Sequence, residues 1–132
     1  MINKFSGFIP FIIWVILIYI LLTLPPKDFK EVEFEIPFAD KAVHAALFAI
    51  MVLLFAWPYR LAPFHKNAFK IFLVMLVAIA YGIAMEYVQK NLTNPRGFEV
   101  GDMIADAVGA IAGFFIARKF IMYFNHKRKA EA

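Results

Sequence analysis

The sequence contains no cysteine among its 132 residues, which excludes disulfide bonds, thiolate metal sites and cysteine nucleophiles. Charge is also scarce: 18% of the residues are Asp, Glu, Lys or Arg, whereas 63% are hydrophobic. The mean hydropathy of +0.71 is too high for a soluble domain of this length. These deficits predict an integral membrane protein.

Repeats, low-complexity segments and nucleic-acid-binding motifs are also missing from the sequence. The net charge of +4 therefore does not indicate a nucleic-acid partner. The positive net charge is explained instead by the positions of the basic residues along the chain.

Four hydrophobic segments are present, at about 5–24, 41–58, 69–89 and 102–124. At about 1.5 Å per residue, some 20 helical residues cross the ~30 Å hydrocarbon layer of a bilayer. We predict an all-α fold, in which residues 1–132 form one polytopic membrane domain, a four-transmembrane-helix bundle. Residues 25–38 are expected to form a polar loop.

Four crossings place both termini on the same side of the membrane. Of the fourteen Lys and Arg residues, nine then fall on that side, and the five on the other side are Lys27, Lys30, Lys41, Lys90 and Arg96. Glu131 is the only one of ten acidic residues on the side of the termini. The excess of basic residues predicts that both termini are cytoplasmic.

Polar residues gather at the ends of the hydrophobic segments that should meet the outer face. These residues are Asp40, Lys41, His44, Glu86, Gln89, Arg96, Asp102 and Asp106. A lone ionised group at bilayer depth costs at least about 2.5 kcal/mol, so we expect them to face one another or a water-filled pocket. Glycines at 109 and 113 continue the stripe of Asp102 and Asp106, and this spacing favours close approach of a neighbouring helix.

Plainer interpretations remain open for several of these residues. Asp40 is well placed to be the N-cap of the second helix, and a buried His44 is commonly a hydrogen-bonded structural residue. Glu86 is as consistent with an ion pair to Arg96 or Lys41 as with a chemical role. Gln89 and Asp102 fit an interfacial position.

In their order along the chain, these residues resemble the VanZ-like family of small bacterial membrane proteins. The matching pieces are Phe38-Ala39-Asp40-Lys41-Ala42-Val43-His44 with Phe48, Tyr81-Gly82-x-x-x-Glu86-x-x-Gln89, and Arg96 leading to Asp102-Met103-Ile104-Ala105-Asp106 and Gly109-x-x-x-Gly113. One departure is Asp106, a position that is commonly Asn in the family. The resemblance implies a multi-pass protein of the bacterial cytoplasmic membrane with a cell-envelope role, since the founding member is linked to teicoplanin resistance.

Three hypotheses for function follow. The first is an outward-facing pocket that binds a lipid headgroup, a lipid-linked wall precursor or an amphiphilic glycopeptide, with Asp40, Lys41, Gln89, Arg96 and Asp106 as ligand-binding residues. The second is a membrane-embedded hydrolase or transferase acting on a lipid-linked substrate, in which His44 or Glu86 is the general base and Asp102 orients it. The third is a small proton-coupled carrier, which would need an oligomer.

No cofactor is expected from the sequence. A hard divalent cation held by His44, Glu86, Asp102 and Asp106 fits by ligand type, but these residues do not have a recognised metal-binding spacing. We therefore assign no metal site. Membrane lipids are the expected partners.

Overall fold

The computed structural model describes residues 5–24, 38–92 and 98–132. Within these ranges the chain forms four α-helices and no β-strand: α1 (Ile9–Thr23), α2 (Ala39–Ala56), α3 (Phe64–Leu92) and α4 (Val100–Ala130). Short 3-10 helices, η1 (Ser6–Phe8) and η3 (Trp57–Tyr59), precede α1 and follow α2. All four helical segments are long and apolar enough to cross a membrane, which confirms the predicted all-α, multi-pass architecture.

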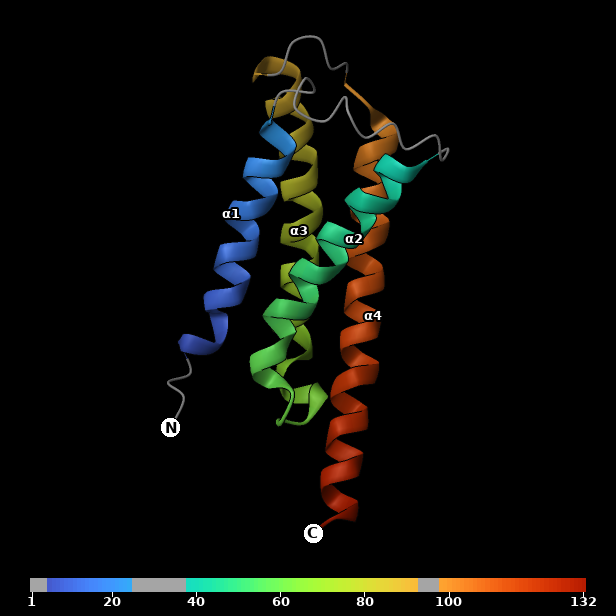
Figure 1. Cartoon of the computed structure of the whole chain (residues 1–132). Helices are drawn as coiled ribbons and strands as arrows, with labels where there is room; N and C mark the ends of the chain where they lie inside the picture. The colour runs from blue at the N-terminus through green and yellow to red at the C-terminus, as the bar shows by residue number, and fades with distance from the viewer. Residues whose placement is uncertain (1–4, 25–37, 93–97) are drawn as a thin grey trace.

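The helices run alternately up and down the bundle (Figure 1). The start of α1 and the end of α4 lie at one end of the molecule, and the starts of α2 and α4 lie at the other end with the last turns of α3. Helix α4 continues well beyond its neighbours at the first of these ends. The arrangement agrees with four crossings, and the side on which the termini lie remains a prediction from charge.

Two of the helices are longer than their hydrophobic segments. Helix α3 begins at Phe64 rather than 69, and α4 continues to Ala130 rather than ending near 124. The added turns contain no Pro or Gly that would stop the helix. They carry good helix formers such as Lys66, Lys127 and Arg128. Hydropathy marks the part of a helix that can lie in the hydrocarbon layer. It does not mark the helix ends, and α3 and α4 extend beyond that part.

The expectation that Asp40 caps α2 is wrong. Helix α2 begins at Ala39, and its N-cap is Phe38, which has a left-handed φ of 66° and makes no side-chain capping bond. Asp40 instead lies in the first helical turn, where a negative charge interacts favourably with the helix dipole. Its carboxylate is therefore free to contact Lys41.

Glycines bring α2 and α4 into close contact. A Cβ added to Gly113 would lie 2.6 Å from the carbonyl oxygen of Ala49, and one added to Gly109 would overlap the carbonyl oxygen of Ala45. Both distances are too short for any side chain, so the two backbones touch as the small-residue spacing predicts. This contact holds the first turns of α4, with Asp102 and Asp106, against α2.

Helix α1 lies at the edge of the bundle and leaves much of its surface uncovered. Ile9, Ile12, Ile13 and Ile16 are all exposed, as expected for a helix that faces lipid. Hydrogen bonds to backbone oxygens fix α1 on its neighbours. Two of them lie along its middle: Trp14 donates from Nε1 to Leu47 O at 2.9 Å, and Tyr81 donates from its hydroxyl to Val15 O at 3.0 Å.

Candidate functional site

A cluster of polar side chains lies where α2 begins, α3 ends and α4 begins, at the upper end of the bundle in Figure 1. We call it the polar cluster; its members are Asp40, Lys41, His44, Glu86, Glu99, Asp102 and Asp106. Three helices contribute to it. Six of the eight residues expected to converge therefore do so, whereas Gln89 bonds to α1 and Arg96 lies outside the described residues.

The innermost contact of the polar cluster joins His44 to Asp106. The two atoms, Nδ1 and Oδ1, are 2.9 Å apart, and the residues are 6% and 1% exposed. An ionised Asp106 can only accept, so Nδ1 carries the proton in that state and Nε2 is left as the second nitrogen of the ring. Nε2 points toward Asp102, whose Oδ2 is 3.8 Å away and too far for a direct hydrogen bond.

The second carboxylate oxygen of Asp106 has a different environment. Oδ2 is buried, and no group in the described ranges donates a hydrogen bond to it. It packs against Gly82 of α3, where an added Cβ would lie 2.8 Å from Oδ2. Because a buried oxygen without a donor is costly, Oδ2 is the unsatisfied acceptor of the polar cluster.

Lys41 supplies positive charge to the outer part of the polar cluster. Its Nζ lies 3.0 Å from Glu99 Oε2, 3.1 Å from Asp102 Oδ1 and 3.6 Å from Asp40 Oδ2. The same three carboxylates lie close enough together to share a metal ion, but the ammonium group of Lys41 already supplies positive charge there. Lys41 is thus paired with three protein carboxylates, and its predicted contact with a ligand stays a prediction.

Glu86 connects α3 to the start of α4. It is 2% exposed, and its Oε2 accepts a hydrogen bond from the backbone N–H of Glu99 at 3.0 Å. An ion pair between Glu86 and Lys41 was one expectation, and it is not formed, since Lys41 contacts other acids. The alternative partner, Arg96, lies outside the described residues.

Gln89 contributes to packing of α1. Its Nε2 donates to the backbone oxygen of Leu22 at 2.9 Å, in a buried position. This bond fastens the end of α3 to the end of α1. A role in holding α1 is therefore visible for Gln89, whereas its predicted ligand contact is not tested.

Glu99 is the member of the polar cluster that sequence reasoning missed. It is the N-cap residue of α4, its side chain contacts Lys41, and its backbone N–H contacts Glu86. An acid three residues before Asp102, near the start of a helix, was the available signal. Its partners, Lys41 and Glu86, lie on two other helices, so the sequence around Glu99 does not identify them.

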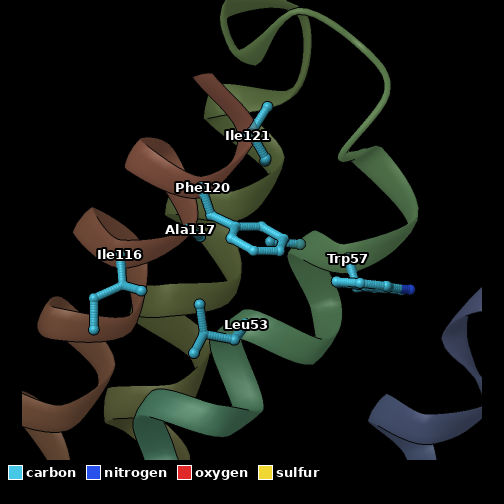
Figure 2. Close-up of a pocket in the computed structure, with 7 residues that line it drawn as sticks. Leu53, Trp57, Ile116, Ala117, Phe120 and Ile121 are labelled. Carbon is cyan, nitrogen blue, oxygen red and sulfur yellow. The ribbon is translucent and has the colours of Figure 1, made fainter. Parts of the chain in front are cut away.

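A separate apolar pocket of about 310 Å³ lies between α2 and α4, near the end of α2. Figure 2 shows Leu53 and Trp57 on one side and Ile116 and Phe120 on the other. The rings of Trp57 and Phe120 are stacked, with centroids 5.7 Å apart. No titratable side chain lines this pocket, so it does not provide groups for acid–base chemistry.

No family model, curated protein or solved structure matches the chain.

Proposed function

We propose that this chain is a VanZ-like protein of the bacterial cytoplasmic membrane that lowers susceptibility to teicoplanin-type glycopeptides. The polar cluster would bind a lipid headgroup, a lipid-linked wall precursor or the amphiphilic drug at the outer face. The observation that carries the proposal is the buried His44–Asp106 pair beneath the Lys41 ion pairs, at one end of a bundle of apolar helices. Polar groups kept at membrane depth are expensive, and they commonly mark functional sites.

The charge of the polar cluster narrows the choice of ligand group. Five carboxylates surround one lysine and one histidine, and the lysine is held by three of those carboxylates. A bare phosphate would meet net negative charge. An amine, or a group rich in N–H and O–H donors, suits the cluster better, because the exposed carboxylates of Asp40 and Glu99 can accept hydrogen bonds from it.

Expression in a glycopeptide-susceptible host tests the proposal. We expect the wild-type chain to raise the inhibitory concentration of teicoplanin and to change the amount of labelled drug on the cell surface. Asp102→Asn and His44→Ala should remove both effects, whereas Glu131→Gln, an exposed acid at the opposite end, should not. Unchanged inhibition and binding in several hosts, with membrane insertion verified, would rule out this function.

A second candidate, the membrane-embedded hydrolase or transferase, is favoured by the His44–Asp106 hydrogen bond. A histidine held through Nδ1 by a carboxylate presents Nε2 as a general base. Asp106 then takes the orienting role that we had expected of Asp102. Purified protein offered a panel of lipid-linked substrates should show turnover, and activity that survives both His44→Ala and Glu86→Gln would exclude this mechanism.

A further inference from the structure

A basic pocket of about 380 Å³ lies at the end of the bundle opposite the polar cluster. It forms between the first residues of α3 and one face of the outer half of α4. Its basic residues are His65, Arg118, His126 and Lys129, and its apolar wall includes Phe64 and Met122. Residues 118, 122, 126 and 129 follow helical spacing, so they share a single face of α4.

The charge of this basic pocket is not balanced by the protein. No acidic residue lines it, and in the described part of the chain no ion pair involves Arg118 or Lys129. Glu131, the one described acid at this end, lies 3.8 Å from Lys127, which is outside the pocket. The other polar lining group, Asn125, uses its amide N–H groups on the backbone oxygens of Ala62 and Ile121.

Neighbouring basic residues differ in this respect, because the protein itself supplies their partners. Arg60 lies over the ring of Trp57 at 4.5 Å and donates to the Trp57 backbone oxygen, and Lys70 lies 5.4 Å from the ring centroid of Tyr59. Arg118 and Lys129 have no such contact in the described ranges. The pair is thus available to an anion from outside the chain.

The position of the basic pocket along α4 indicates the kind of anion. At 1.5 Å per residue, Arg118 lies about 27 Å from Val100, near the far edge of a ~30 Å hydrocarbon layer that begins at the start of α4. Lys129 lies about 16 Å farther along, in the headgroup region or beyond it. The pocket therefore crosses the edge of the hydrocarbon layer, with Arg118 near that edge, Lys129 on its headgroup side and the apolar Met122 between them.

We propose that the basic pocket binds the phosphodiester headgroup of an anionic phospholipid, with Arg118 and Lys129 supplying positive charge on either side of the phosphate and Phe64 and Met122 contacting the apolar part of the lipid nearest the headgroup. This site is separate from the polar cluster and does not depend on the function proposed for it. A free phosphate ion shares the headgroup chemistry but would leave the apolar wall without a partner.

Lipid retention by the full-length protein in an uncharged detergent tests the site. Phosphatidylglycerol, phosphatidylcholine and inorganic phosphate are added in turn, and bound lipid is measured by native mass spectrometry. The double variant Arg118→Gln/Lys129→Gln should have an affinity for phosphatidylglycerol that is lower by roughly tenfold or more. The reason is that each basic residue near the lipid surface strengthens the attraction to an anionic headgroup. The matched control, Lys119→Gln/Arg128→Gln, removes the same charges outside the pocket and should change binding less than about twofold.

Each other outcome contradicts part of the proposal. Equal losses in the two double variants would show diffuse attraction rather than a site, and equal retention of phosphatidylcholine would remove the role of the anionic headgroup. Displacement of the lipid by low concentrations of inorganic phosphate would assign the pocket to a soluble anion. If the double variant does not fold, the single variant Lys129→Gln, at an exposed position near the helix end, is compared with wild-type protein for phosphatidylglycerol binding instead.

Discussion

The two ends of the bundle use charge in opposite ways. At one end, basic side chains of α2 pair with acidic side chains of α2 and of the start of α4, and Asp106 and His44 are buried. At the other end, basic residues dominate, and Arg118 and Lys129 face outward without acidic partners in the described ranges. The comparison teaches that the first end is organised by contacts within the protein, whereas the second is suited to contacts with its surroundings.

The largest expected effect comes from separating the helices that form the paired end. Gly109→Leu places a side chain where the Ala45 carbonyl lies, so α2 and α4 must move apart. We expect a loss of stability of about 3 kcal/mol or more, and of most properly folded protein. Thermal unfolding in detergent provides the measurement.

Val108→Leu is the control for this change, because Val108 is 57% exposed on the same helix. It should unfold at close to the wild-type temperature. If Gly109→Leu also unfolds there, the contact between the two backbones does not hold the polar cluster together.

The next effect tests the buried pair itself. His44→Leu should destabilise the protein by about 3 kcal/mol, because it leaves the Asp106 carboxylate buried without its donor. The double variant His44→Leu/Asp106→Leu removes both partners and should recover much of that loss. Equal or greater destabilisation in the double variant would mean that the two side chains are not coupled.

A gain of binding should follow removal of the lysine from the polar cluster. In Lys41→Ala, Asp40, Glu99 and Asp102 lose the ammonium group that they share, and their carboxylates lie close enough to hold one cation. We expect Ca²⁺ to raise the unfolding temperature of this variant, but not that of wild-type protein or of Lys90→Ala. A Ca²⁺ response of equal size in all three proteins would show that Lys41 does not block a cation site.

The smallest effect belongs to the basic end. Lys127 and Glu131 form an exposed pair on the last turn of α4, so Glu131→Gln should change stability by less than about 0.5 kcal/mol. Thermal unfolding at low and high salt measures it. A loss comparable to that of His44→Leu would contradict the distinction between the two ends.

The sequence was sufficient for the architecture because hydropathy and length decide which segments can cross a bilayer. It also indicated which residues would gather, since Asp106 and His44 could not be left singly in hydrocarbon. The sequence did not indicate which group each polar side chain would contact. Gln89 bonds to α1 and Glu99 joins the polar cluster because helix rotation and packing place them there, and neither property follows from the pattern of one segment.

Helix boundaries were less predictable for a related reason. Asp40 matched an N-cap by residue type, which would start the helix at Lys41, but α2 starts two residues earlier, at Ala39, after Phe38 turns the chain with a positive φ. At the opposite end, α4 continues through Lys127, Arg128 and Lys129 because backbone hydrogen bonding does not require a hydrophobic sequence.

Labelling of single cysteines in intact bacterial cells tests most directly whether the polar cluster faces outward. The native chain has no cysteine, so Glu99→Cys and Lys129→Cys each carry one reactive thiol, one at either end of α4. We predict that a membrane-impermeant maleimide labels Glu99→Cys in intact cells and Lys129→Cys only after permeabilisation. The reverse pattern would place the polar cluster in the cytoplasm and contradict its proposed role at the outer face.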